Sequence, residues 1–149
     1  MTLFEQVSEG IIAAMKSREK EKLEALRNLK KVMIEARSTK GAGSELTDEE
    51  SLKIIQKLVK QRRESAAIYK ENNRQELAEK ETIEADVLEK YLPARMGDEE
   101  LTLVVKAIID RLGAKSLSEM GRVMGVATKE LTGKADGKDI SAKVKQLLG

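Results

Sequence analysis

Apolar residues recur three or four positions apart along nearly the whole chain, and this spacing constrains the fold more than any other feature of the sequence. Leu3, Val7, Ile11 and Met15 form the first apolar stripe, and similar stripes continue to the C-terminus. Residues spaced in this way lie on one face of an α-helix, where they can pack into a core. The chain is also rich in Lys, Glu, Leu and Ala and contains a single proline, so the sequence predicts an all-α protein.

Start and stop signals divide this pattern into seven predicted helices. The clearest signal is a capping box, in which Thr47 can accept a hydrogen bond from the Glu50 amide while the Glu50 side chain reaches back. A flexible glycine-containing loop precedes this box and ends the second helix. The predicted helices lie near residues 3–15, 18–39, 47–71, 75–92, 98–112, 118–131 and 139–148.

Pro93 marks the predicted boundary between two domains. Proline cannot continue a helix, and it disfavours helical backbone at the preceding Leu92. Gly97 and the acidic residues 98–100 then signal the start of a new helix. We therefore expect an N-terminal bundle of about four helices, two of them long, over residues 1–92. A small three-helix domain should follow over residues 93–149.

The absence of histidine and cysteine restricts the chemistry that the chain can perform. Histidine is the commonest general acid or base near neutral pH, and the two residue types supply most zinc ligands. Ser–His and Cys–His nucleophile pairs are therefore excluded, whereas carboxylate, lysine or Ser–Lys chemistry remains open. We predict no catalytic residue, no metal and no cofactor, and a chain that is not an enzyme on its own.

No stretch of the sequence resembles a signal peptide or a membrane span. We therefore expect a soluble, cytoplasmic protein without membrane contact. The formal net charge is only +2, and no segment forms a basic arm. Any contact with nucleic acid must then use local basic patches.

The sharpest local feature is the segment 132–138, which contains two glycines and two lysines. Gly133 and Gly137 allow positive φ and close approach of a ligand to the backbone. Lys134 and Lys138 place positive charge beside the amides of the next helix start, where anions bind readily. The residues alone leave two interpretations open. The segment is either a cradle for a nucleic-acid phosphate or a helix–loop–helix turn whose lysines keep it solvated.

Gly121 and Gly125 stand four positions apart within the sixth predicted helix. Each glycine costs a helix about 1 kcal/mol relative to alanine, which suggests that something approaches the backbone closely. We favour another helix of the same domain as the neighbour. The alternative is an external partner, for which Arg122 and Lys129 would supply positive charge.

Polar residues interrupt the apolar stripes of the third and fourth predicted helices. Arg62 falls among apolar neighbours on one helix, and Glu81 and Glu84 do so on the other. We predict that the helices pack antiparallel and that Arg62 forms a structural ion pair with Glu81 or Glu84. A carboxylate pair for acid–base catalysis is the alternative. An adjacent arginine should lower the pKa of a carboxyl group, which is unfavourable for a general acid.

Two further groups of basic residues follow helical spacing. The third helix carries Lys60, Arg63, Lys70 and Arg74, and the second helix carries Arg27 and Lys31. Either group could contact phosphate. A solvated helix face, balanced by carboxylates one turn away, is the interpretation that we favour.

Several separate stretches resemble the GatB/YqeY family. They are residues 26–29, 60–65, 91–93, 120–124 and 133–137, together with Arg74, Leu77, Glu81 and Glu84. This family groups small stand-alone proteins with the tail domain of the B subunit of the tRNA-dependent Asp/Glu amidotransferase. The resemblance covers essentially the whole chain, and it implies a helical N-terminal domain followed by a small three-helix C-terminal domain.

For function, the resemblance implies tRNA contact and not amide transfer. In the amidotransferase the tail helps to position tRNA, while catalysis belongs to other domains and subunits that have no counterpart here. A family label of carbon–nitrogen ligase with glutamine as amido-N-donor would be inherited from those parts. The nucleic-acid-binding positions that the resemblance carries over are Arg122, Lys129, Gly133, Lys134, Gly137 and Lys138.

The sequence thus predicts a non-catalytic accessory module that binds tRNA or another structured RNA. The alternative is a protein-interaction module that docks on an amidotransferase or an aminoacyl-tRNA synthetase. Recognition of RNA should depend on its shape, because Phe4, Tyr69 and Tyr91 lie on apolar stripes and leave no platform for base stacking.

Overall fold

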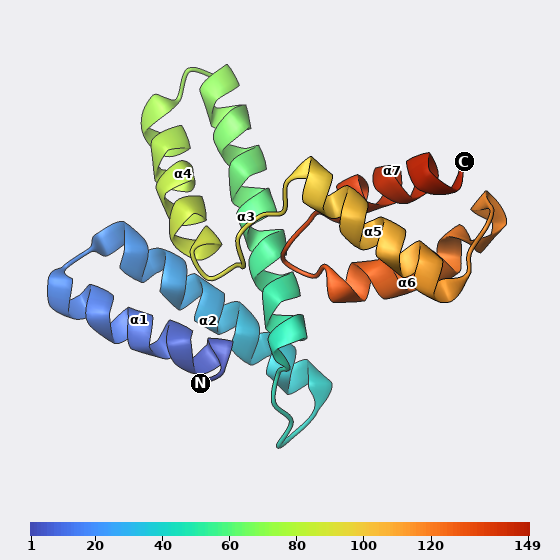
Figure 1. Ribbon diagram of the computed structural model, residues 1–149. Helices are drawn as coiled ribbons and strands as arrows, with labels where there is room; N and C mark the ends of the chain where they lie inside the picture. The colour runs from blue at the N-terminus through green and yellow to red at the C-terminus, as the bar shows by residue number, and fades with distance from the viewer. The chain divides into compact units, whose positions relative to one another are not determined.

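The computed structural model describes residues 1–149 and contains helices and turns but no strand, which confirms the predicted all-α class. Figure 1 shows the helices in chain order. They are α1 (Leu3–Ser17), α2 (Lys20–Lys40), α3 (Asp48–Glu71), α4 (Gln75–Glu89), α5 (Asp98–Leu112), the short 3-10 helix η1 (Leu117–Glu119), α6 (Met120–Glu130) and α7 (Gly137–Leu148). None of them combines the length and the apolar character that a membrane crossing requires.

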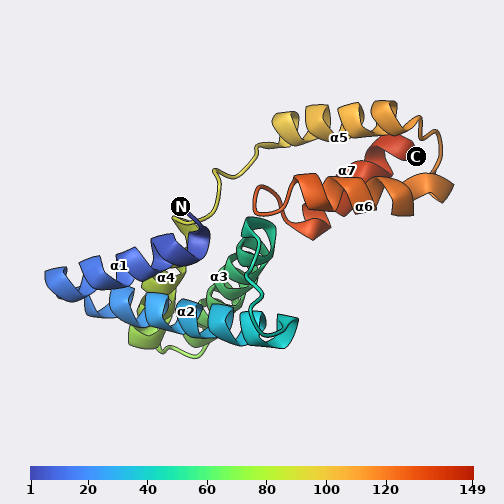
Figure 2. The same cartoon turned by 90° about the horizontal axis from the view of Figure 1, so that it is seen from below.

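The chain forms two compact units, unit 1 from Met1 to Leu92 and unit 2 from Pro93 to Gly149. Unit 1 consists of two helical hairpins, α1–α2 and α3–α4 (Figure 1), and α2 also packs against α4. Figure 2 shows the same two hairpins from below. The fully buried side chains at the centre of unit 1 are Val7, Leu26, Leu29, Met33, Ile55 and Leu88.

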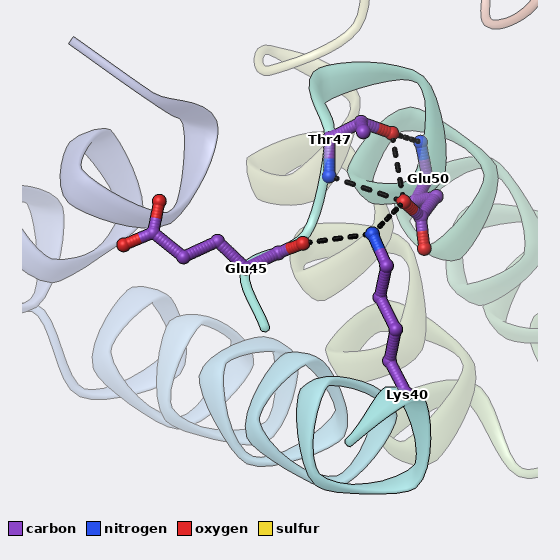
Figure 3. Close-up of polar contacts among 4 residues, drawn as sticks. All are labelled: Lys40, Glu45, Thr47 and Glu50. Carbon is purple, nitrogen blue, oxygen red and sulfur yellow. Dashed lines mark hydrogen bonds and ion pairs between the residues drawn. The ribbon is translucent and has the colours of Figure 1, made fainter. Parts of the chain in front are cut away.

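Capping boxes fix where α1 and α3 begin. The Thr2 hydroxyl accepts a hydrogen bond from the Glu5 amide at 3.1 Å, and the Glu5 carboxylate accepts one from the Thr2 amide at 2.9 Å. Thr47 and Glu50 repeat this arrangement at the start of α3 (Figure 3), with distances of 3.1 and 3.3 Å. Each box satisfies amides that the first helical turn leaves without a partner.

Unit 2 has a separate core between α5, α6 and α7. Its large buried side chains with the least exposure are Val105, Ile108, Val123, Leu131, Ile140 and Val144. Lys143 is also buried, and its Nζ pairs with the Asp98 carboxylate at 2.9 Å. This pair joins the first turn of α5 to α7.

Several helix ends differ from the sequence-based expectation, among them those of α4, α6 and α7. The fourth helix stops at Glu89 instead of Leu92, because the residues before Pro93 form a tighter turn in which the Leu92 amide donates to the Glu89 carbonyl at 3.0 Å. The sixth helix begins at Met120, after the 3-10 turn η1. The last helix begins at Gly137, because Asp136 takes the extended backbone of an N-cap.

Gly10 of α1 makes the tightest glycine contact in unit 1. A Cβ atom added at Gly10 would lie 2.4 Å from the Tyr91 hydroxyl oxygen and 3.1 Å from Leu26 Cδ1. Burial raises the pKa of that hydroxyl. The residues that follow α4 therefore lie against α1 only because position 10 has no side chain.

We expect Gly10→Ala to destabilise unit 1 by about 1–2 kcal/mol, since overpacking should outweigh the helix-propensity gain of roughly 1 kcal/mol. The same substitution in the Tyr91→Phe background should cost less. Without the hydroxyl, the nearest atom of the ring lies 3.7 Å from the added Cβ atom, which is an ordinary contact distance. Denaturant unfolding of the four proteins, followed by circular dichroism, measures this coupling. An equal cost in both backgrounds would show that the hydroxyl is not the obstacle.

Candidate nucleic-acid interface

The turn between α6 and α7 is held by backbone hydrogen bonds, so that its lysine side chain points outward. The amides of Lys134 and Ala135 donate to the Leu131 carbonyl at 2.9 and 3.2 Å. The Lys134 carbonyl accepts from the Met96 amide at 3.0 Å. Gly133 takes a φ of 79°, a left-handed conformation that lets the chain reverse. Leu131, Gly133 and Ala135 are buried, whereas Lys134 is exposed.

Acidic residues around this turn are already paired. Arg111 pairs with Glu130, and Arg95 pairs with Asp136 at 2.7 Å and with Asp139 at 3.9 Å. Three exposed lysines in the same stretch of the chain, by contrast, form no ion pair: Lys129, Lys134 and Lys138. The segment 129–139 therefore presents positive charge that no neighbouring carboxylate compensates.

Gly121 and Gly125 lie on the exposed face of α6. A Cβ atom added at either position would meet nothing within 4 Å. The prediction that another helix of the same domain packs against these glycines is therefore wrong. The reason is geometric: α6 turns Val123 and Ala127 toward the core, and residues two positions away lie on nearly the opposite face of a helix. The glycines leave a strip of surface without side chains.

Arg122 is engaged inside unit 2, although it was predicted to contact nucleic acid. Its Nη2 donates to the Leu112 carbonyl at 2.6 Å and to the Glu119 carboxylate at 3.1 Å. The first contact caps the C-terminal end of α5, where a cation is favourable. Arg122 thus offers less free charge to a ligand than the three lysines do.

Gly137 and Lys138 form the first two positions of α7 instead of a loop. Gly137 is exposed, and an added Cβ atom would meet nothing within 4 Å. The Asp136 side chain makes no capping hydrogen bond to this helix. The exposed Gly137 leaves the start of α7 open to solvent on that side, with Lys138 beside it.

Arg62 of α3 lies between the two predicted glutamates of α4. Its Nη1 donates to the Glu81 carboxylate at 3.2 Å and also to the Glu84 carboxylate. Its Nε is buried without a hydrogen-bond partner. Glu84 is only 5% exposed, so a substrate could not reach it.

Burial raises the pKa of the Glu84 carboxyl, and this effect exceeds the lowering by Arg62. Arg62 acts in the expected lowering direction, but the expectation that the pKa of Glu84 is lowered overall is wrong. The spacing of the sequence identified Arg62 as the partner of Glu84, but it does not show how far burial desolvates the Glu84 carboxyl group.

The raised pKa of Glu84 has a testable consequence for stability. A carboxyl group whose folded pKa lies above its usual 4.5 stabilises the fold when protonated, and this stability is lost as pH rises through the folded pKa. We expect Glu84→Gln to match the parent protein near pH 4.5 and to become relatively more stable toward pH 7. Urea unfolding of both proteins across this range measures the difference. A variant that becomes relatively less stable toward pH 7 would contradict the expectation.

The fold and the site together define a class of small all-helical protein, in which a helical bundle precedes a three-helix unit with a lysine-bearing turn. A family model described as "Yqey-like protein" matches residues 4–148, and the chain belongs to this family. A relative from Pyrenophora tritici-repentis (strain Pt-1C-BFP), named "Altered inheritance of mitochondria protein 41, mitochondrial", is 31% identical over 140 residues. The match covers 91% of this chain and 75% of the relative. The name of that relative places it in mitochondria, and a cytoplasmic location for the present chain stays a prediction.

Proposed function

We propose that this chain is a non-catalytic accessory module that binds tRNA or a similarly structured RNA. The observation that carries the proposal is the group of three exposed, unpaired lysines at residues 129, 134 and 138 in a stretch whose acidic residues are all paired. The side-chain-free strip at Gly121 and Gly125 lies on the same helix as Lys129. A phosphate backbone could approach this strip closely. The resemblance to the amidotransferase tail domain supports tRNA as the ligand.

Recognition in this proposal depends on phosphate contacts and RNA shape. Unit 2 contains no Phe, Tyr or Trp, so it cannot stack bases on an aromatic ring. Lysine ammonium groups can instead neutralise phosphates and release counterions. Such contacts fix the position of an RNA without reading its sequence.

The test is binding of the full-length protein to bulk tRNA, measured by fluorescence anisotropy over a range of salt concentrations. We expect saturable binding whose affinity falls with salt, with a log–log slope of roughly −2 to −3 for three phosphate contacts. Absence of binding at low salt would overturn the proposal. A slope near zero would show that the lysines do not contact phosphates.

Docking on an amidotransferase or an aminoacyl-tRNA synthetase is the second candidate function. Two exposed leucines of unit 2 favour it, Leu103 on α5 and Leu117 on η1. They are the large hydrophobic residues of this unit that are exposed, and a docked protein would cover them. Capture of such an enzyme by the full chain, without saturable tRNA binding, would favour this candidate over the first.

A further inference from the structure

Cations on α2 form a second basic region, within unit 1. Arg27, Lys30, Lys31 and Arg37 have no carboxylate partner. Glu24, on the same helix, is already paired with Lys80 of α4 at 3.2 Å. Glu21 and Glu35, also on α2, form no ion pair, so no carboxylate holds any of these four cations.

Two of these cations share one aromatic ring. The Arg37 guanidinium carbon lies 4.8 Å from the centroid of the Phe4 ring, and Lys30 Nζ lies 5.6 Å from it. Stacking holds the guanidinium in place at low entropic cost and leaves its N–H donors free. Two like charges at one ring also repel each other, and a bound anion would relieve that repulsion.

Arg37 lines an open hollow at the connection between α2 and α3. The hollow has a volume of about 510 Å³ and is lined by Arg37, Ser38 and the loop residues 41–45. The hydroxyls of Ser38 and Ser44 make no hydrogen bond within the protein. Gly43 takes a φ of 77°, and the Ser44 amide donates to the Gly41 carbonyl at 3.2 Å. Arg37, Ser38 and Ser44 therefore line the same hollow, and their side-chain donors are not used in hydrogen bonds or ion pairs within the protein.

Lys40 holds this loop against the start of α3 (Figure 3). Its Nζ donates to the Glu45 carbonyl at 2.9 Å and to the Glu50 carboxylate at 2.7 Å. Lys40 thereby neutralises Glu50 and is itself not available to a ligand. The Glu45 side chain points away from Lys40 in Figure 3, and Glu45 is the acidic residue among those that line the hollow. That charge opposes an anion and limits its affinity.

We propose that this hollow binds a phosphate group, with Arg37 as the main ligand and the hydroxyls of Ser38 and Ser44 as further donors. Arginine presents N–H donors in a planar fork that matches phosphate oxygens. The volume exceeds what a bare phosphate fills, so a terminal phosphate monoester on a nucleotide or an RNA also fits. The site lies in unit 1 and does not depend on the proposed role of the lysines in unit 2.

The test is a titration of the full-length, ¹⁵N-labelled protein with inorganic phosphate, against sodium chloride at matched ionic strength. We expect saturable shifts of the amide signals of residues 37–45 with phosphate only. Arg37→Gln should weaken the affinity by about tenfold or more, as expected for removal of a charged hydrogen-bond donor. Arg27→Gln removes the same charge from the same helix outside the hollow and should weaken the affinity only by the smaller long-range effect of charge, which salt screens. Glu45→Gln should tighten binding.

Several outcomes would overturn the proposal: no saturable shift, the same shift with chloride, or equal weakening by Arg37→Gln and Arg27→Gln. If Arg37→Gln loses the folded spectrum, Ser44→Ala serves in its place and should weaken binding without disturbing Phe4. A short RNA with a 5′-phosphate, compared with the same RNA lacking it, shows whether the bound phosphate belongs to an RNA end or is the free ion. Shifts with the phosphorylated RNA alone identify a terminal phosphate, and shifts with inorganic phosphate but neither RNA identify the free ion.

Discussion

Replacing Arg62 with methionine should lower the free energy of unfolding of unit 1 by about 3 kcal/mol at pH 7, because removing one partner leaves a buried charge uncompensated. The affected charge is that of Glu84, whose side chain is only 6% exposed. The second carboxylate, Glu81, is 21% exposed and can be hydrated in part. The expected decrease in stability therefore lies at the lower end of the range for buried pairs.

The neighbouring Arg63 provides a matched control. It pairs with Asp86 at 2.8 Å and with Glu89 at 2.6 Å, yet it is 38% exposed. Arg63→Met should cost less than about 1 kcal/mol, as is usual for ion pairs at the surface. Tyrosine fluorescence during urea unfolding reports on unit 1 alone, since both tyrosines, Tyr69 and Tyr91, lie within it.

The pH dependence of the Arg62→Met effect shows whether Arg62 stabilises unit 1 through its charge or through the packing of its side chain. Without the guanidinium, a protonated Glu84 no longer needs a counterion. The decrease in stability should therefore shrink as pH falls toward 4.5. A decrease that stays constant with pH, or one that equals the Arg63→Met decrease, would show that Arg62 stabilises unit 1 by packing alone.

The interaction of Arg62 with two glutamates was accessible from sequence because both partners interrupt apolar stripes on helices joined by a short turn. Helical spacing then brings them to one interface. The direction of the Glu84 pKa was not accessible, since it depends on how many atoms of other helices cover the carboxylate. The stacking of Arg37 on Phe4 was missed for a similar reason. The two residues come from α2 and α1, and no motif joins them.

Glycines gave the least reliable predictions, because a glycine in a sequence does not show on which side its neighbours lie. The spacing of Gly121 and Gly125 suggested a close approach of another helix, but both face solvent. Gly10 follows no such spacing, yet it lies against Tyr91. Arg122 was likewise assigned from sequence similarity, whereas its main partner is a backbone carbonyl at the end of another helix. In each case the way one helix packs against its neighbours decides what the residue contacts, and the spacing of residues in the sequence does not show this packing.

Changing Lys129, Lys134 and Lys138 together to glutamine should weaken tRNA binding by roughly a hundredfold, since each charged interaction with a phosphate is worth up to about tenfold. The slope of log affinity against log salt should also fall by about 0.7–0.9 for each phosphate that the protein no longer neutralises. The three side chains are exposed and unpaired, so the fold should be unaffected. Fluorescence anisotropy with labelled tRNA measures both quantities.

The decisive comparison is with a second triple variant of the same net charge. Lys106, Lys115 and Lys145 also lie in unit 2, and their exposed ammonium groups form no ion pair. If RNA binds at the α6–α7 turn, changing these three to glutamine should reduce the affinity only by the smaller long-range effect of net charge, which salt screens. Equal weakening by both triple variants would mean that the unit attracts RNA through its overall charge. In that case the turn would be a solvated helix connection and not an interface.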